Sequence, residues 1–442
     1  MFTAIFSLPL QARTVAKARA PVRHVASPPV PSPTPVPVLS GSEVYNRASA
    51  SIFKIITRLK DAVSERGHGT AFVIHPHGYL VTNLHVVASA LEQPEKYVLM
   101  LLDKQNQIPA EVVAVDAVND LALVRVQQRF ERFLPIAPQA SYSVGDTVFS
   151  LGFPKSEELT IIQGNFNGER TMGFAPVFAA SMPLNPGMSG GPTLNSSGFV
   201  IGVNRAMMNR AQNISYLSPW ASLVAIAAKI QAGVSKSFDW RQEAVSQILA
   251  QEKKASAILQ ASSGLIKPQR VGELKFTLSL ANLLCGQDDL EKKGSMALIC
   301  QGVSLALLGS DVDALEFEML VTRGELPFSS STFSQVDKRY SEAKKRYKKL
   351  IEVSQEKGAR KKVSERCGAK NVRNQNGVTL VTRYCSLAVP KFSGLYSTFV
   401  KIEFGKGSEK TNISQFYQGL GLETTTSVLE KFLESIESGG EK

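Results

Sequence analysis

The sequence contains no long hydrophobic run and few histidines, and both shortages narrow what the protein can do. No apolar stretch approaches the roughly 18 residues that a transmembrane helix requires, so we expect no integral membrane span. All five histidines occur at or before residue 85. A site that needs an imidazole must therefore take it from His24, His68, His75, His77 or His85.

Cysteine is also scarce, and it is confined to the C-terminal half. The chain has four cysteines, without a C-x-x-C spacing or a neighbouring histidine, so we expect no zinc site. We also expect no other metal and no cofactor. Three disulfide connectivities are possible. The four residues form two local pairs, each able to staple a hairpin in an oxidising compartment; the alternative is buried free thiols. The candidates are Cys285, Cys300, Cys367 and Cys385.

The remaining composition is that of a globular protein. Hydrophobic residues make up 43% of the 442 residues and charged residues 20%, which excludes disordered and fibrous classes. The length allows two or three domains. A formal net charge of +12 favours acidic partners or surfaces and says nothing about the fold.

The first 42 residues have the composition of a targeting segment and a spacer. An apolar stretch, residues 2–10, is followed by small residues as in a secretory signal, although a basic start is missing. Four basic residues between positions 13 and 23, with no acid before Glu43, are equally typical of an organellar transit peptide. Residues 28–38, "PPVPSPTPVPV", predict a semi-rigid polyproline spacer.

From residue 43 to 218 the sequence is a series of short β-branched or aromatic runs, separated by Gly, Pro and Asn/Asp turns. This spacing predicts a β-barrel or a β-sandwich. A helical pattern returns only after Trp220. The expected strands are "GTAFVIH", "YLVTNLHVV", "KYVLMLL", "AEVVAV", "LALVRV", "TVFSLGF", "FVIGVN" and "ISYLS".

One serine is surrounded by an unusual number of glycines and prolines. Ser189 lies in "NPGMSGGPTL", residues 185–194, where three glycines and two prolines surround it. Such a cluster is typical of a tight turn, and it also suits a nucleophile whose neighbouring N–H groups must converge on one point. A serine nucleophile needs an adjacent base, and that base needs a carboxylate. His85 and Asp120 meet this need, in the order His, Asp, Ser that chymotrypsin uses.

Residues 45–225 resemble a trypsin-like serine protease of the HtrA/Deg type. The resemblance is carried by five segments in the same order, and it implies two packed β-barrels with the catalytic site between them. His85 and Asp120 would come from the first barrel and Ser189 from the second. The segments are "GHGTAFVI", "GYLVTNLHVV", "DAVNDLALVRV", "VGDTVFSLGFP" and "LNPGMSGGPTL…GFVIGVN".

The resemblance further implies an oxyanion hole and a specificity pocket. The N–H groups of Gly187 and Ser189 would bind the developing oxyanion. Met188 and Ala71 depart from the family pattern without affecting the chemistry, whereas Pro183 stands at the pocket base without a carboxylate. The pocket would then be apolar and suited to Val, Ala or Leu, although its residues could equally be barrel core. The expected pocket residues are Pro183, Leu184, Met208 and Ile214.

The C-terminal half does not match a PDZ domain, because too few residues follow "GLGL" at 419–422. Residues 239–260 have apolar residues at helical spacing and predict a connecting helix. Beyond residue 270, strand-like runs around a polar helix predict an accessory α+β domain. The expected organisation is 1–42 targeting segment and spacer, 43–228 protease domain, 229–269 helical connector and 270–442 accessory domain.

These patterns predict a serine endopeptidase acting on proteins or peptides, in the periplasm or secreted, with an organellar location as the alternative. Residues 337–362 concentrate basic charge on an expected helix. This helix is either a solvated surface or a patch for nucleic acid, anionic lipid or an acidic polymer. The alternative function is therefore a catalytically silent binding or adhesion module that uses the basic C-terminal domain.

Overall fold

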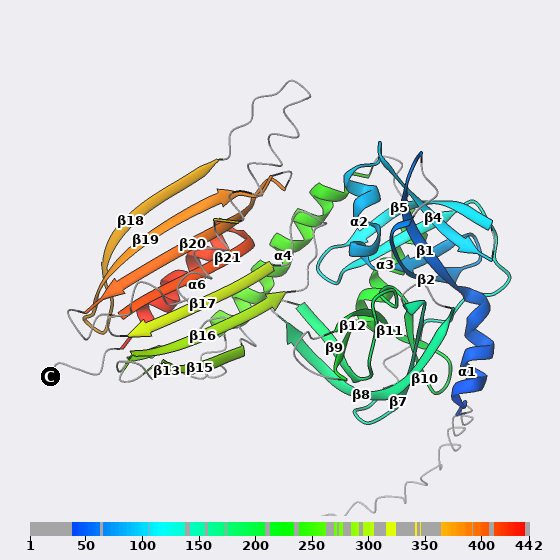
Figure 1. Ribbon diagram of the computed structural model, residues 1–442, viewed down its shortest axis with the longest axis horizontal. Helices are drawn as coiled ribbons and strands as arrows, with labels where there is room; N and C mark the ends of the chain where they lie inside the picture. The colour runs from blue at the N-terminus through cyan, green and yellow to red at the C-terminus, as the bar shows by residue number, and fades with distance from the viewer. Residues whose placement is uncertain are drawn as a thin grey trace, which may run out of the picture. The chain divides into compact units, whose positions relative to one another are not determined.

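The protein is described by a computed structural model (Figure 1), which divides into two compact units, Met1–Pro37 and Val38–Lys442. The described residues all belong to the second unit. They are 38–61, 65–104, 106–137, 142–154, 158–172, 175–207, 213–233, 238–261, 269–271, 274–276, 284–290, 295–304, 315–323, 341–342, 345, 364–390, 392–405 and 411–437.

Six strands close into a first barrel with the order β1-β2-β3-β6-β5-β4. Neighbouring strands pair antiparallel, and β-branched and leucine side chains of β2 and β6 fill the interior. The barrel leaves the short β3 next to β6, so the chain segments after β3 and before β6 lie side by side. The strands are β1 (Ile52–Leu59), β2 (Glu65–His75), β3 (Tyr79–Thr82), β4 (Tyr97–Asp103), β5 (Asn106–Asp116) and β6 (Leu121–Val126).

A second barrel of six strands has the order β10-β11-β12-β9-β8-β7. Its core includes an aromatic cluster in which Tyr142, Phe166 and Phe178 pack edge to face. Two closed six-stranded barrels in succession are the chymotrypsin fold, as expected. The strands are β7 (Thr147–Gly152), β8 (Thr160–Met172), β9 (Ala175–Ser181), β10 (Pro192–Asn195), β11 (Val200–Met207) and β12 (Ser215–Pro219).

Two α-helices precede Trp220, where the sequence predicted only strands. Helix α1 (Gly41–Ala48) begins with a capping box between Ser40 and Glu43, and a short 3-10 helix η1 (Ser49–Ser51) follows it. Helix α2 (Leu84–Glu92) occupies the second half of the expected strand 79–87. The strand prediction was wrong there because two adjacent valines favour a strand, whereas the buried face (Leu84, Val87 and Ala88) has helical spacing.

Two further helices follow the barrels, and the second lies where the sequence predicted a connecting helix. Helix α3 (Trp220–Ala232) packs on β5, β6, β11 and β12, and α4 (Trp240–Ala261) coincides with the expected connecting helix. Within the described residues, no helix is long and apolar enough to cross a membrane.

The C-terminal half is α+β, as expected. A seven-stranded antiparallel sheet has the order β15-β16-β17-β21-β20-β19-β18, and β13 (Gln269–Val271) pairs with β14 (Leu274–Phe276). Helix α6 (Leu422–Ser435) packs on β14, β20 and β21. The sheet strands are β15 (Leu284–Leu290), β16 (Ser295–Ser304), β17 (Leu315–Arg323), β18 (Glu365–Arg373), β19 (Thr379–Ala388), β20 (Leu395–Phe404) and β21 (Thr411–Gly421).

The cysteines lie on paired strands of this sheet. Cys367 and Cys385 form a disulfide between β18 and β19, with Cα atoms 4.1 Å apart. Cys285 and Cys300 are register partners on β15 and β16, and their side chains lie outside the described residues. Most of the basic segment 337–362 also lies outside them.

Candidate active site

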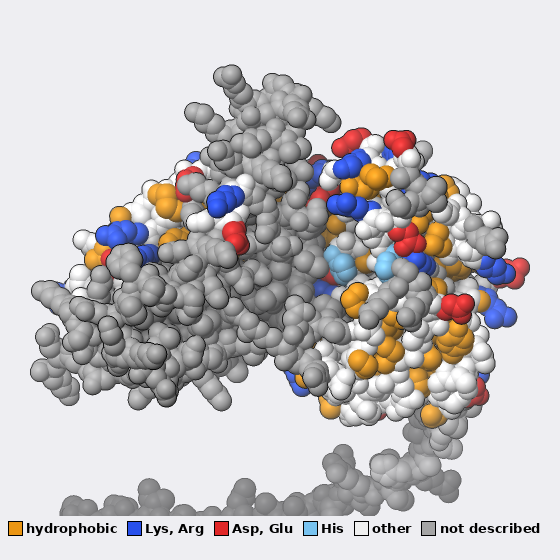
Figure 2. All heavy atoms as spheres, viewed as in Figure 1, with side chains coloured by type: hydrophobic (Ala, Val, Ile, Leu, Met, Phe, Trp, Pro, Cys, Tyr) orange, Lys and Arg blue, Asp and Glu red, His pale blue; other side chains and the backbone are white. Residues whose placement is uncertain are grey.

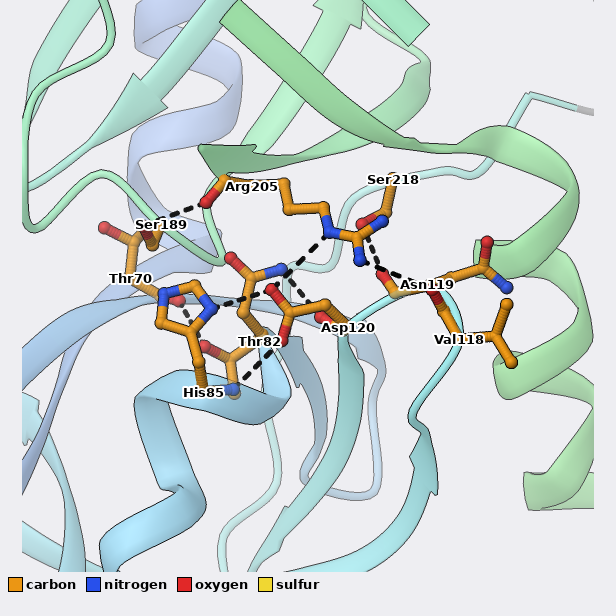
Figure 3. A network of polar contacts seen from close by, with 10 residues as sticks. Thr70, Thr82, His85, Val118, Asn119, Asp120, Ser189, Arg205 and Ser218 are labelled. Carbon is orange, nitrogen blue, oxygen red and sulfur yellow. Dashed lines mark hydrogen bonds and ion pairs between the residues drawn. The ribbon is translucent and has the colours of Figure 1, made fainter. Parts of the chain in front are cut away.

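Asp120 and His85 meet where β3 and β6 run side by side. His85 is the second residue of α2, and Asp120 directly precedes β6. The backbone N–H of His85 donates to Oδ1 of Asp120 over 3.0 Å, and Nδ1 lies 2.7 Å from Oδ2 (Figure 3). This contact with a carboxylate places the ring proton on Nδ1, so Nε2 is left to accept a proton.

The backbone of Asp120 is held in a conformation that few residues with a side chain adopt. Its φ is 54°, in the left-handed region, and the residue is fully buried. The side-chain amide of Asn83 donates to the Asp120 carbonyl over 2.8 Å, and the Leu84 N–H donates to the same oxygen over 3.2 Å. These bonds hold the backbone from which the Asp120 side chain reaches His85.

Ser189 lies in the loop between β9 and β10, which the first barrel holds through Thr70. The Thr70 N–H donates to the Ser189 carbonyl, and its hydroxyl donates to the Gly187 carbonyl, each over 2.8 Å. The Thr70 carbonyl accepts from Thr82 in turn, over 2.7 Å. One buried threonine of the first barrel therefore places the serine loop of the second.

The Ser189 hydroxyl donates to the carbonyl of Arg205 over 3.4 Å (Figure 3). Within the part of the chain that the structure describes, no hydrogen bond joins it to His85. The backbone of the serine loop approaches the start of α2 at Gly69, where an added Cβ would lie 3.0 Å from the Ser189 carbonyl oxygen and 2.7 Å from the Val86 side chain. Catalytic hydrogen bonds are often loose before substrate binds.

The serine loop keeps two N–H groups unused. The N–H groups of Met188, Gly190 and Gly191 donate to backbone carbonyls. Among the described residues, those of Gly187 and Ser189 have no acceptor. Gly187 has a φ of 96°, and a Cβ there would lie 2.2 Å from the carbonyl oxygen of Phe153. The local backbone is thus available only to glycine.

The residues expected to line the specificity pocket do not share one environment. Leu184 is 4% exposed and belongs to the core of the second barrel, where its N–H donates to the Ser215 hydroxyl over 3.3 Å. Pro183 is exposed, and Ile214 is 37% exposed. Met208 lies outside the described residues. The pocket stays a prediction.

Arg205 is a functional candidate that the sequence analysis missed. It lies on β11 at a register shift in the pairing with β12, and it is 2% exposed. Its Nε is 3.8 Å from Oδ2 of Asp120, and an Nη donates to the Val118 carbonyl over 3.3 Å. An arginine inside an apolar strand run could have been noticed, because a buried charge needs a partner.

Asp116 is the second carboxyl group near this arginine. It accepts from the backbone and side chain of Asn119, over 3.0 and 2.8 Å, in the turn before Asp120. Burial raises the pKa of Asp116, while the bonds from Asn119 and the charges of Arg205 and Lys229 lower it. Through these bonds Asp116 stabilises the turn before Asp120.

Histidine, basic and acidic side chains all reach the surface of the barrels on the face drawn in Figure 2. The His85 side chain is 27% exposed, whereas that of Asp120 is buried. The arrangement therefore combines a solvent-accessible imidazole, a buried carboxylate and a serine on a glycine-rich loop.

Comparisons with known proteins agree with the fold. Residues 69–203 match the family model of the trypsin-like peptidase domain. A protein of Pseudomonas fluorescens described as a probable periplasmic serine endoprotease, DegP-like, is 26% identical over 207 residues, covering 45% of this chain and 41% of that protein. One of Chlamydia pneumoniae with the same description is 33% identical over 157 residues, covering 34% and 31%. The chain thus spans less than half the length of these relatives.

Solved structures with a similar region include a serine endoprotease of Yersinia pestis. It is 22% identical and covers 45% of this chain and 67% of its own, with a TM-score of 0.38. The active form of a protease from M. tuberculosis is 23% identical and covers 48% of this chain and 97% of its own, with a TM-score of 0.39.

Proposed function

We propose that this chain, whose residues 69–203 match the trypsin-like peptidase domain, is a serine endopeptidase with Ser189, His85 and Asp120 as its catalytic triad. The observation that carries the proposal is the buried Asp120 carboxylate, which binds both the N–H and the ring of His85 beside a glycine-rich serine loop.

In the proposed reaction, Nε2 of His85 removes the proton from Ser189 as Oγ attacks the carbonyl carbon of a peptide bond. The imidazolium then gives this proton to the leaving amine, and the acyl group stays on Oγ. Water attacks the acyl-enzyme in the second half, and the proton again passes through His85. Asp120 stays ionised and stabilises the imidazolium in both halves.

The N–H groups of Gly187 and Ser189 would bind the oxyanion. When Oγ adds to the carbonyl carbon, negative charge forms on the carbonyl oxygen. Gly187 and Ser189 would donate to it from a loop whose shape is set before the reaction, so little reorganisation is needed.

The substrates we propose are unfolded proteins or exposed segments, cut after small to medium apolar residues. Pro183, Leu184 and Ile214 carry no charge that could pair with a lysine or an arginine, and burying an unpaired cation costs several kcal/mol. An apolar side chain gains roughly 25 cal/mol per Å² of buried surface. We place the protein in the periplasm or outside the cell, as the descriptions of the relatives and the disulfide of β18 and β19 suggest.

A fluorophosphonate probe, which reacts with an activated serine, tests the proposal. We expect the probe to label the wild-type protein, and we expect Ser189→Ala to abolish both labelling and degradation of a denatured protein with nearly the same melting temperature. Ser197→Ala, the same change in the turn after β10, should keep both activities. Labelling of Ser189→Ala, or no labelling of the wild type, would exclude this triad and favour a binding module.

A mass-spectrometric map of the cut sites tests specificity in the same experiment. We expect the residue before the cut to be Val, Ala or Leu. Substrates with one of these residues there should have a kcat/KM that is one to two orders of magnitude higher than substrates with a charged residue. A majority of cuts after Arg or Lys would contradict the apolar pocket and leave the triad unaffected.

A further inference from the structure

Arg205 points into the site because of an irregularity in its strand. Strand β11 pairs Asn204 with Leu217 and Ala206 with Tyr216, so Arg205 is the extra residue of a β-bulge. Bulges redirect side chains next to active sites. Here the guanidinium lies on the far side of the Asp120 carboxylate from the His85 ring (Figure 3).

Arg205 and His85 therefore both approach the same carboxylate oxygen of Asp120. Oδ2 of Asp120 is 2.7 Å from Nδ1 of His85 and 3.8 Å from Nε of Arg205. The guanidinium is permanently charged, because arginine does not lose its proton in proteins. His85 becomes positive only when it takes a proton. The fixed charge and the transient charge thus compete for the same negative partner.

Resting on the proposed function, we infer that Arg205 is a positioning residue that orients the Asp120 carboxylate and extends the activity of the triad to more acidic pH. A fixed positive charge opposes a second one on the imidazole, so His85 stays neutral and competent as a base at lower pH. The imidazolium formed during the reaction is also stabilised less, so the maximal rate is lower.

The other charged groups near Arg205 modify this effect. Asp116, at the end of β5, faces the guanidinium and compensates part of its charge. Lys229 of α3 acts on Asp116, and it bonds Glu243 of α4 over 3.0 Å. Burial lowers the pKa of Arg205, and the charges of Asp120 and Asp116 offset only part of this effect.

The pH profile of kcat/KM in Arg205→Gln tests the inference, with Arg205→Lys as the matched variant that keeps the charge. For unit charges on opposite sides of one carboxylate, at an effective dielectric of about 20, Coulomb's law gives a shift on the order of one to two pH units. We expect the acid limb of Arg205→Gln to move up by about this amount and that of Arg205→Lys to stay within about 0.3 units of wild type. Unmoved limbs in both variants, or equal shifts in both, would overturn the inference.

A second variant and a second readout keep the test decisive if Arg205→Gln folds poorly. Asp116→Asn removes the compensating charge and should move the acid limb down. The C2-proton titration of His85, followed by NMR in the Ser189→Ala background, should show the same two directions without catalysis. If the wild type is inactive, the proposed function fails while this titration still decides the role of Arg205.

Discussion

At the scale of single residues, Gly187 shows how little freedom the serine loop has. Its φ of 96° disfavours any residue with a Cβ, and an added Cβ would lie 2.2 Å from the Phe153 carbonyl and 2.7 Å from Nε2 of His68. Gly145 provides a contrast, because its φ is 98° but an added Cβ would meet nothing within 4 Å. An alanine at Gly145 would introduce backbone strain alone, whereas an alanine at Gly187 would add a steric clash, so comparing the two substitutions distinguishes these effects.

We expect Gly187→Ala to lower kcat/KM by about 10²- to 10³-fold, because the loop must shift and the oxyanion loses a donor. The same change should cost about 1–3 kcal/mol of stability. Gly145→Ala introduces the backbone strain without the steric clash, so it should cost about 1–2 kcal/mol and leave kcat/KM unchanged. Urea unfolding and peptide hydrolysis measure both effects. Equal activity losses in the two variants would contradict a role of Gly187 in the oxyanion hole.

At the scale of elements, α4 contacts both halves of the chain. Near its start, Gln247 accepts from the Ala117 N–H over 2.8 Å and donates to the Val115 carbonyl over 2.9 Å, on either side of Asp116. Further along, Glu252 is buried and accepts from the Gly421 N–H and, over 2.7 Å, from Thr424. A carboxylate at the N-terminus of α6 suits the helix dipole.

Glu252 makes the contact between α4 and the start of α6 sensitive to pH. Burial raises its pKa from 4.5 to about 7, against the lowering effect of its bonds to Thr424 and Gly421. Between these values the folded state holds a proton that the unfolded state has lost, so the stability that this proton provides is complete below pH 4.5. This contribution to the free energy of unfolding is lost as the pH rises through 7, and it amounts to at most about 3 kcal/mol.

We expect the wild type to lose stability between pH 5 and pH 8 relative to Glu252→Gln, in which the slope from this group disappears. Urea unfolding at both pH values measures the difference. Glu243→Gln, on the same helix, is the control. The bond from Lys229 lowers the pKa of Glu243, so its contribution changes in the opposite direction and in a more acidic range. Equal pH dependence in the wild type and Glu252→Gln would refute the shift.

At the scale of the whole molecule, the sheet of the C-terminal half ends in an edge strand that is covalently attached. Strand β18 is largely exposed, and it pairs only with β19 among the described strands. Exposed edge strands can pair with other chains or slip in register. The Cys367–Cys385 disulfide joins register partners 18 residues apart and so fixes the alignment of β18.

The entropy of loop closure predicts how much this disulfide contributes to the free energy of unfolding. For a loop of this size, removing the crosslink with Cys367→Ser and Cys385→Ser should cost about 3 kcal/mol. Urea unfolding followed by fluorescence or circular dichroism would measure it. In protein isolated from its native compartment, iodoacetamide under denaturing, non-reducing conditions should leave both cysteines unmodified. Alkylation of both would contradict the oxidising location.

Local patterns in the sequence were sufficient for much of the fold. Strand β6 coincides with the run "LALVRV", and β7, β11 and β12 agree within a few residues with the expected strands. These runs are apolar because both barrel interiors require it, so the signal is local. Helix α2 was missed because its valines favour a strand in isolation, and packing against the first barrel decided otherwise.

For the site, residue chemistry and order were enough to select His85, Asp120 and Ser189 as candidates, since few histidines were available. Their geometry depends on the tertiary structure, because Asp120 meets His85 only where β3 pairs with β6. Arg205 enters the site through a bulge, which no local pattern specifies. Glu252 meets Gly421 across 169 residues. The sequence determines which side chains are present and which faces are buried. Strand register and packing decide which side chains come into contact, such as His85 and Arg205 at the carboxylate of Asp120.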